Sequence, residues 1–454
     1  MLKKIKLIIN YFLPFEDFTH ILQLDYYNYS RYLKQIFNPL YFKIFKRNLQ
    51  KREKIKYTLR SVSTIILSYL IFLSILVFII ILRTTLINKF FLILVLLLLS
   101  PIVVLIANIP TLLLRLGYFT EIEKAKKKIN QFTDLKIIAI TGSYGKTTTK
   151  NILYELLKYN YKVQFIENNI NTPIGIAKWV NTTLLNNTQI LIVEMGALSK
   201  NVIKRSASIT PPDYAIITEL GDQHMDRFKT FNNLVNTKLE IFFLEKSKKY
   251  ILSNVYKKIK FNTNISNLTI IEDQDIKEKY NINPDKIKKF NKGNLLLAIY
   301  LAKDLGISDH FIVDSINNIK LPNRRKNIID INGYTVIDDS YNISLNTAKN
   351  SLSYAKDYSK ENHKSLIVIT GGIPESSTKI KKVNEEFGRI LFKQDIIIIL
   401  LSTVFEKFIL RGIPDKKNVF NKNSMEEALQ HVFKTYPKQE YIILMLPELS
   451  DLSY

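Results

Sequence analysis

The stretch that most constrains the fold is residues 141–149, which read Thr-Gly-Ser-Tyr-Gly-Lys-Thr-Thr-Thr. It follows an apolar run, residues 135–140, that is typical of a buried strand. It opens a segment, residues 146–159, whose apolar side chains fall on one helical face. A strand, a glycine turn and a helix form the context in which backbone N–H groups and a helix N-terminus bind phosphate. The order therefore predicts an α/β domain built around a phosphate loop.

Each residue type in this loop has a physical role. Glycines allow the backbone to close on phosphate oxygens, Lys146 would reach the terminal phosphates, and the Thr147 hydroxyl would bind Mg²⁺. The full eight-residue phosphate loop has a glycine at position 140, where this chain has Ile140, so the motif is a short form. A glycine turn with an incidental lysine is the alternative. The predicted nucleotide contacts are Gly142, Ser143, Tyr144, Gly145, Lys146, Thr147 and Thr148.

Composition excludes several classes of chemistry and leaves others open. The chain of 454 residues contains no cysteine, which excludes disulfides, thiolate catalysis and cysteine zinc sites. A net charge of +25 would ordinarily suggest nucleic acid or an anionic membrane as a partner. Lysine, isoleucine and asparagine are abundant throughout, and no base-reading module accompanies the charge. We therefore expect no nucleic-acid partner.

Two long apolar runs predict a membrane segment. Residues 61–82 contain no ionisable acid or base, and 22 helical residues span roughly 33 Å against a bilayer core of about 30 Å. Residues 90–114 form a second uncharged run, interrupted by Pro101 and Pro110. A buried helical pair in a soluble protein is the alternative. We predict a two-helix transmembrane hairpin over residues 61–116.

The distribution of lysine and arginine predicts the orientation of this hairpin. Residues 1–60 are basic, and the flank after residue 114 is also rich in lysine, whereas the connecting loop has only Arg83 and Lys89. The positive-inside rule then places both flanks, both termini and the catalytic domains in the cytoplasm, where ATP is available. The basic residues before the first run are Lys43, Lys46, Arg47, Lys51, Arg52, Lys54, Lys56 and Arg60.

Polar residues follow two of the later predicted strands, residues 190–195 and 214–220. Glu194 and His224 stand there, and ligands of parallel sheets gather at the carboxyl ends of strands. With Thr147 they make a plausible Mg²⁺ set, although each taken singly is more typical of a solvated loop residue. Lys238 lies on a predicted helix, and by spacing alone it is a surface lysine.

A second α/β unit is predicted after an exposed basic linker, residues 321–325. Its expected strands are residues 335–338, 365–370, 396–401 and 441–446, with helices starting at Ser344 and Ser424. The predicted organisation is a basic segment (1–60), a hairpin (61–116), a central ATP-binding domain (117–328) and a Rossmann-like C-terminal domain (329–454).

These pieces in this order resemble the Mur ligase family, the ATP-dependent amide ligases of peptidoglycan precursor synthesis, and most closely the members that add D-alanyl-D-alanine. The resemblance covers roughly residues 135–380, and Phe290 and Glu219 stand where the family has histidine and asparagine. The matching elements are the phosphate loop, Asn168 to Gly175, Val193 to Ala197, Ile209 to His224, Lys238, Asn291 with Asn294, Arg324, and Asp338 to Asn342.

The resemblance implies a role for each matched residue. Glu194, His224 and Thr147 would hold Mg²⁺, and Lys238 would be carbamylated to position a second magnesium ion. Lys146, Lys238 and His224 would form the catalytic set. Asn291 would contact adenine, Arg324 is the arginine of the interdomain linker, and Asp339 would contact ribose.

Two departures limit what the resemblance implies about substrates. The family's UDP-sugar domain is missing, with the hairpin in its place, and residues 446–451 replace its substrate loop. The implied function is a membrane-anchored ligase that phosphorylates a muropeptide carboxylate, UDP-linked or lipid-linked, and joins it to D-alanyl-D-alanine or another amino acid. A folate-polyglutamate-type ligase of the same superfamily and a nucleotide-binding membrane scaffold with weak catalysis are the alternatives.

Overall fold

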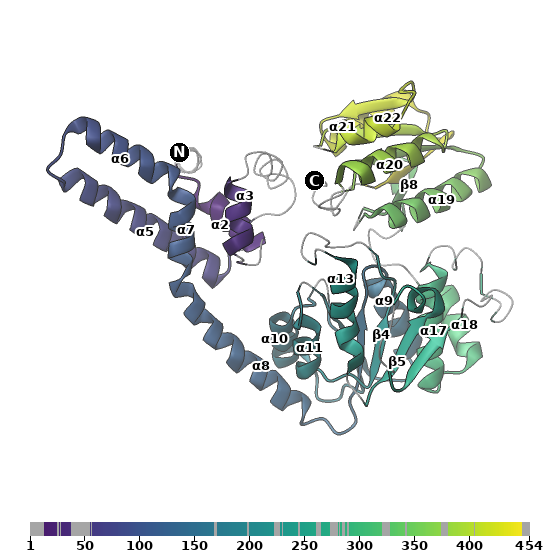
Figure 1. The fold of residues 1–454 in the computed structure, drawn as a ribbon. Coiled ribbons are helices and arrows are strands. Elements are labelled where there is room, and N and C mark those ends of the chain that lie inside the picture. The colour runs from purple at the N-terminus through teal and green to yellow at the C-terminus, as the bar shows by residue number, and fades with distance from the viewer. Residues whose placement is uncertain are drawn as a thin grey trace. The chain divides into compact units, whose positions relative to one another are not determined.

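The computed structural model divides into two compact units, and the boundary in the chain falls between Thr120 and Glu121 (Figure 1). Each unit has its own core, and each is described separately. The described residues are 13–24, 27, 29–37, 55, 57–167, 170–197, 199–221, 228, 230–243, 246–259, 265–272, 280, 282–283, 287, 290–319, 327–340, 343–373, 380–403 and 405–446.

The first unit is helical, and its longest helix matches the first predicted membrane span. Helix α5 (Leu59–Ile81) begins at a capping box in which Thr58 and Ser61 bond each other's backbone N–H. Within the described residues it is the one single helix long and apolar enough to cross a bilayer. Helix α6 (Leu86–Leu98) packs beside it as the second arm of a hairpin (Figure 1).

The second predicted span is broken, which differs from the expected continuous helix. Helix α6 is followed by α7 (Ser100–Asn108) and the 3-10 helix η1 (Pro110–Arg115), with a bend of 59° after Leu98. Pro101 explains the bend, because it has no N–H to donate to the carbonyl of Leu97 and its ring crowds that carbonyl. Of the two predicted spans, only the first is a single unbroken helix in the structure, and the second is a bent pair of helices.

A polar cluster and two short helices hold the base of this unit together. The Arg60 guanidinium donates to Asn108 Oδ1 at 2.8 Å and stacks on the Tyr27 ring at 3.7 Å, while Asn108 Nδ2 donates to Thr64 Oγ1 at 2.8 Å. Helices α2 (Phe15–Leu24) and α3 (Tyr29–Phe37) bury apolar residues against this base. The hairpin arms beyond the base expose large apolar side chains, Phe78 and Phe90 among them.

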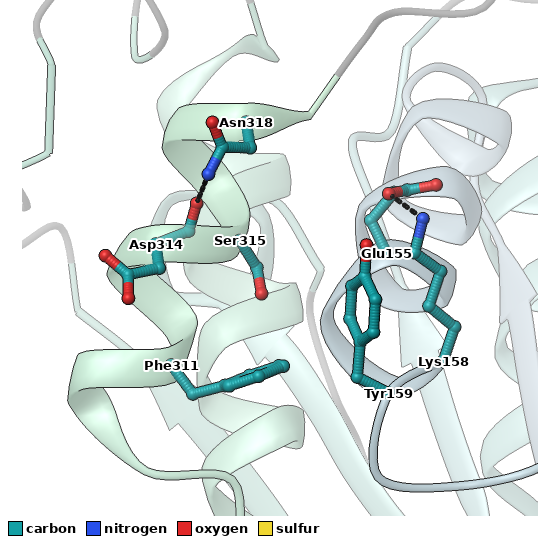
Figure 2. A pocket seen from close by; sticks show the side chains of 7 residues that line it. All are labelled: Glu155, Lys158, Tyr159, Phe311, Asp314, Ser315 and Asn318. Carbon is teal, nitrogen blue, oxygen red and sulfur yellow. Dashed lines mark hydrogen bonds and ion pairs between the residues drawn. The ribbon is translucent and has the colours of Figure 1, made fainter.

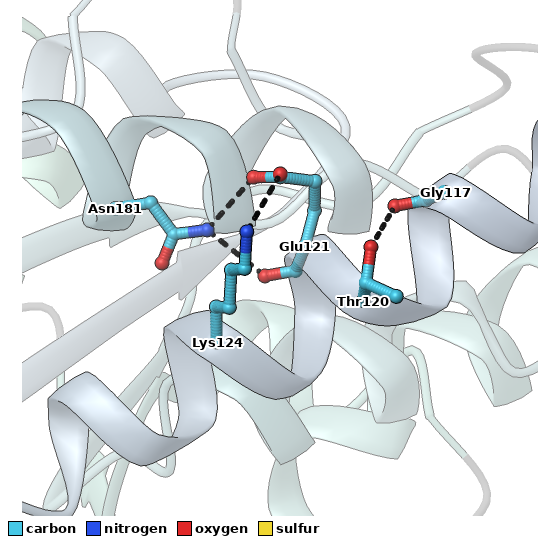
Figure 3. Close-up of polar contacts among 5 residues, drawn as sticks. All are labelled: Gly117, Thr120, Glu121, Lys124 and Asn181. Atoms are coloured by element: carbon cyan, nitrogen blue, oxygen red, sulfur yellow. Dashed lines mark hydrogen bonds and ion pairs between the residues drawn. The ribbon is translucent and has the colours of Figure 1, made fainter.

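Helix α8 (Leu116–Ile129) continues into the second unit and is fixed there to α10 (Pro173–Thr183). Figure 3 shows Asn181 Nδ2 donating to the backbone and side-chain oxygens of Glu121 at 3.0 and 2.9 Å. Lys128 Nζ donates to the carbonyls of Val180 and Leu184 at 2.9 and 2.8 Å. The side chain of Lys128, which lies on α8, thus provides a hydrogen-bond donor for carbonyls at the C-terminal end of α10.

The first sheet of the second unit has six parallel strands in the order β2-β3-β1-β4-β5-β6. Its central strands are almost entirely buried and mostly apolar because helices cover both faces (Figure 1). The strands are β1 (Lys136–Thr141), β2 (Val163–Phe165), β3 (Ile190–Glu194), β4 (Tyr214–Ile217), β5 (Lys248–Leu252) and β6 (Leu268–Ile271). The further helices are α9 (Lys146–Leu157), α11 (Val202–Ile209), α13 (Phe231–Leu239), η2 (Glu240–Phe243), α14 (Ser253–Tyr256), α17 (Lys292–Asp304) and α18 (Asp309–Asn318).

The second sheet has the order β11-β10-β9-β12-β8-β7 and is parallel except for the antiparallel edge strand β7. Its strands are β7 (Asn327–Ile331), β8 (Tyr334–Asp338), β9 (Ser365–Thr370), β10 (Ile397–Leu401), β11 (Val419–Lys422) and β12 (Tyr441–Met445). Its helices are α19 (Leu345–Glu361), α20 (Ile380–Phe392), α21 (Glu406–Ile409), η3 (Leu410–Gly412) and α22 (Met425–Thr435). The predicted α/β class with parallel sheets is confirmed.

Candidate active site at the phosphate loop

The phosphate loop follows β1 and can only be made with glycine at two positions. Gly142 has φ +152°, and a Cβ there would lie 1.8 Å from Thr218 Oγ1. Gly145 has φ +85° and caps α9, and its Cβ would lie 2.3 Å from Asn294 Oδ1. The loop therefore packs closely against the end of β4 on one side and the start of α17 on the other.

Strand β4 and the residues after it hold the loop in shape. The N–H groups of Ser143 and Tyr144 both donate to the carbonyl of Glu219, at 2.7 and 3.3 Å. Thr218 Oγ1 donates to the Tyr144 carbonyl at 2.6 Å, and Ser143 Oγ donates to the Gly221 carbonyl at 2.9 Å. Thr218 was not singled out from the sequence, and only the packing of two neighbouring strands reveals its role.

The tightness of the loop gives a stability prediction. Gly145→Ala is expected to lower the free energy of unfolding by about 2–3 kcal/mol, because it combines a left-handed backbone with a clash against Asn294. Gly306→Ala is the matched control, since Gly306 has φ +87° but nothing within 4 Å of the place that a Cβ would take. The control should lose only about 1–2 kcal/mol. Equal losses in denaturant titrations of the two variants would contradict the contact with Asn294.

Two lysines donate hydrogen bonds to the same carbonyl oxygen of the loop. Lys146 Nζ donates to the carbonyls of Gly142 at 2.7 Å and Ser143 at 3.1 Å. Lys238 Nζ, from α13, donates to the Gly142 carbonyl at 2.7 Å, and its side chain is 3% exposed. Lys238 is thus a buried residue of this site, and the interpretation as a surface lysine from spacing alone was wrong.

Burial changes the chemistry of Lys238. Desolvation, with a smaller contribution from the positive charge of Lys146, places the pKa of Lys238 well below its ordinary value. The neutral amine is therefore populated at a lower pH than for a solvated lysine. A neutral amine is nucleophilic, whereas an ammonium is not.

Thr147 and Glu194 meet at the ends of α9 and β3. Thr147 Oγ1 lies 3.2 Å from Glu194 Oε2, and Glu194 Oε1 forms an ion pair of 2.8 Å with Lys150 Nζ. The carboxylate and the hydroxyl are hard oxygen donors, and both are of the kind that Mg²⁺ prefers. The two residues fit a magnesium ion, although the described residues contain no cluster of three or more histidine, aspartate and glutamate side chains.

Two asparagines lie at the start of α17. Asn291, predicted to contact adenine, has φ 67° and caps α17 by accepting from the Gly293 N–H at 2.9 Å. Asn294 supports the loop from behind: its Oδ1 accepts from Thr149 Oγ1 at 3.3 Å and its Nδ2 donates to the Phe290 carbonyl. The sequence pattern singled out both residues but did not predict the loop contact of Asn294.

The remaining predicted residues lie elsewhere. Asp339 follows β8 of the second sheet, where its carboxylate accepts from Ser351 Oγ and its N–H donates to the Met445 carbonyl at 3.1 Å. Several residues lie outside the described residues: His224, Arg324, Asn168, Asn169, Tyr341, Asn342, residues 447–451 and most of the basic flank from Lys43. Their predicted roles stay predictions.

A hollow of about 450 Å³ lies at the other end of α9, away from the phosphate loop (Figure 2). It runs between α9 and α18, and the rings of Tyr159 and Phe311 meet edge to face there at 5.8 Å. Lys158 pairs with Glu155 at its rim. Glu155, the first residue of α9 that lines it, lies nine positions after Lys146, roughly 13 Å along the helix at 1.5 Å per residue, so the hollow is no part of the predicted nucleotide site.

The central sheet corresponds to a known domain. Residues 140–305 match the Mur ligase middle domain. The UDP-N-acetylmuramoyl-tripeptide--D-alanyl-D-alanine ligase of Rickettsia prowazekii is 25% identical over 361 residues, which cover 72% of this chain and 78% of the relative. The enzyme of the same name from Bacillus subtilis is 24% identical and covers 71% of this chain and 76% of its own.

Solved structures share the fold. MurF from Acinetobacter baumannii superimposes with a TM-score of 0.61 at 19% identity, covering 73% of this chain and 77% of its own. The MurF ligase from Thermotoga maritima in complex with ADP gives a TM-score of 0.60 at 20% identity, covering 73% and 81%. Mur ligases are ATP-dependent enzymes that form amide bonds. Residues 140–305 therefore form a Mur ligase middle domain, and the chain is similar to MurF ligases in sequence and in fold.

Proposed function

We propose that this protein is a membrane-attached, ATP-dependent ligase that joins a muropeptide carboxylate to D-alanyl-D-alanine or a similar amine. One observation carries the proposal. A phosphate-loop lysine and a buried lysine with a lowered pKa meet at the Gly142 carbonyl, and a Thr147–Glu194 oxygen pair lies at the first turn of α9, directly after the loop. Perturbed ionisable groups beside a phosphate loop are typical of a phosphoryl-transfer site.

The reaction balances in two steps. A carboxylate oxygen of the muropeptide attacks the γ-phosphorus of ATP, which gives an acyl phosphate and ADP. The amine of the incoming dipeptide then attacks the acyl carbon, phosphate leaves with the bonding electron pair, and the amine loses a proton. Lys146 would release the loop carbonyls and pair with the β- and γ-phosphates, while Thr147 and Glu194 would hold the metal. Mg²⁺ at that position would supply neutralising charge for the transferring phosphoryl group.

Lys238 enters the proposal through its neutral amine. The amine nitrogen would attack carbon dioxide and lose a proton, which converts a cationic side chain into an anionic carbamate. Such a carbamate presents oxygen donors to a hard cation, whereas an ammonium repels it. The lowered pKa of Lys238 supports this modification, because the neutral amine is available at a lower pH than for a solvated lysine, and falling pH should reverse the modification as the amine is protonated.

The decisive experiment is ATP turnover by the purified full-length protein with defined substrates. UDP-linked and lipid-linked muropeptides are offered separately, each with D-alanyl-D-alanine, and a folate with glutamate serves as the competing substrate class. Phosphate release that requires both a muropeptide and an amine supports the proposal. Turnover with the folate pair alone, or binding of ATP without turnover on any pair, would contradict it.

The proposal includes a topology in which α5 crosses the membrane and the bent pair α6 and α7 returns. Both flanks would then be cytoplasmic, because the connecting loop carries only Arg83 and Lys89. A reporter fused at residue 86 should appear outside the membrane and one fused at residue 125 inside. If both reporters are inside, the hairpin enters and leaves the same face of the bilayer, and the two-span topology is wrong.

The hairpin stands where the resemblance would place a UDP-sugar domain, and it would take over part of that domain's work. Confinement to a surface raises the effective concentration of a lipid-linked substrate without any new contact. The basic flank before α5 would add attraction to anionic head groups, about 1 kcal/mol for each charge near the surface. A plain anchor for an enzyme with an ordinary UDP-linked substrate is the alternative.

A truncated protein beginning at Glu121 separates these two roles. We expect it to lose activity on lipid-linked muropeptide in liposomes while it keeps its activity on soluble substrate. If the truncated and full-length forms use UDP-linked muropeptide equally well and neither accepts the lipid-linked form, only the anchor remains.

A further inference from the structure

Lys150 is the residue at this site whose role the reaction above leaves open. It lies one turn after Lys146 on α9 and is 2% exposed. A buried lysine requires strong compensation, and this one has two partners: Glu194 Oε1 at 2.8 Å and the Ile166 carbonyl at 3.0 Å. Its ammonium also lies 5.2 Å from the centre of the Phe165 ring. These contacts fix the lysine between α9 and the two strands β2 and β3.

The same contacts fix the Glu194 carboxylate in one orientation. Oε1 faces Lys150, while Oε2 faces the Thr147 hydroxyl at 3.2 Å. Only the Oε2 side is directed toward the residue that would share a metal ion. Lys150 therefore determines which oxygen of Glu194 is presented to the phosphate loop.

The charges at the site also affect the binding of a divalent cation. Among the described side chains, Lys146 contacts the Gly142 carbonyl and Lys150 contacts Glu194, the carboxylate of the site. Before the nucleotide arrives, these two lysines repel a divalent cation and attract a polyanion. The ion pair with Lys150 cancels the charge that Glu194 would otherwise offer to a metal.

We propose that Lys150 positions Glu194 and balances its charge, so that the divalent cation binds together with the nucleotide and not before it. The inference rests on the proposed function, because it assumes that Thr147 and Glu194 hold the metal of MgATP. It adds a positioning residue and an order of binding. Lys150 itself touches neither metal nor substrate.

The test measures Mn²⁺ binding to the full-length protein in detergent without nucleotide, by titration and by the metal-dependent rise in unfolding temperature. Lys150→Met keeps the length of the side chain and removes its charge. We expect this variant to bind Mn²⁺ at least tenfold more tightly than the wild type, and to be stabilised by Mn²⁺ where the wild type is not. The double variant Glu194→Gln/Lys150→Met, which has no unpaired charge, should show neither effect. Equal Mn²⁺ binding by the wild type and Lys150→Met would overturn the inference.

Two further outcomes keep the test decisive. If Lys150→Met folds only when Mn²⁺ is present, the metal has replaced the lysine as the partner of Glu194, which supports the inference. If Mn²⁺ does not rescue its folding while the double variant folds, the inference fails. Mn²⁺ binding by the wild type with a non-hydrolysable ATP analogue is the separate check on the proposed function. Its absence overturns the ligase and the inference together, whereas its presence beside an unchanged Lys150→Met overturns the inference alone.

Discussion

Lys146→Ala is expected to reduce ATP turnover by at least about a hundredfold. The side chain already lies against the loop, donating to the carbonyls of Gly142 and Ser143, so a short movement would carry its charge to bound phosphates. Loss of one preorganised electrostatic contact in a partly dehydrated site corresponds to roughly 3 kcal/mol of transition-state stabilisation. The measurement is steady-state phosphate release at saturating ATP.

A second lysine on the same helix provides the control for this prediction. Lys158 lies at the other end of α9, where it is partly exposed and pairs with Glu155. Lys158→Ala should leave turnover within about twofold, because a surface ion pair contributes little. If Lys146→Ala hydrolyses ATP as fast as Lys158→Ala, Lys146 does not act on the phosphates.

Lys238→Ala should abolish most of the activity, and short-chain carboxylates added to the assay should restore part of it. The carbamate that we propose for Lys238 places an anionic oxygen donor beside Gly142, and a diffusible carboxylate can occupy the space that alanine leaves. Without rescue, the expected loss is of the same order as for Lys146→Ala. The measurement is the concentration dependence of turnover on acetate or formate.

A second buried lysine provides the control for this rescue experiment. Lys249 on β5 is fully buried and donates to the carbonyls of Ser247 and Ser266 at 2.8 and 3.0 Å. Lys249→Ala should destabilise the protein, and carboxylates should not restore its activity. Full activity of Lys238→Ala, or equal rescue of both variants, would rule out a carbamylated ligand at residue 238.

Local sequence patterns predicted the central strands and the helices beside them because these elements are governed by short-range rules. The apolar runs at residues 135–140, 190–195, 365–370 and 441–446 correspond to strands within one or two residues. The short strands β2, β6, β7 and β11 were not predicted. Each has only three to five residues, and the partner strand, rather than any alternation of its own, defines it.

The bend after Leu98 shows a second limit of prediction from the sequence. Composition alone measures how apolar a segment is, and residues 90–114 pass that test as one run. Pro101 then divides the run into two helices, because a missing N–H and a steric contact override the apolar composition. The uncharged length of a segment is therefore a poor guide to the length of its helix wherever a proline lies inside it.

The sequence suggested residues of the candidate site where one residue type implies one chemistry. It did not do so where tertiary packing determines whether a side chain is buried. Lys146 and Glu194 were proposed as candidates from their places after a glycine turn and at a strand end, and their roles stay predictions. Lys150 and Lys238 are lysines on helices, and spacing gave no sign that the sheet and the loop would cover them. Burial of a charge depends on partners far away in the chain, such as Ile166 for Lys150.

The contact between Thr149 and Asn294 joins residues 145 positions apart, which orders events during synthesis. At about 5–20 residues per second, Asn294 emerges from the ribosome roughly 7–30 s after the phosphate loop. The apolar helices α5 and α6 precede both, so they are available for insertion while the loop still lacks its support. A nascent chain that stalls in this interval would expose a glycine-rich turn beside an unfinished sheet. Under the proposed topology it would do so at the membrane, where proteases or chaperones of that surface would meet it first.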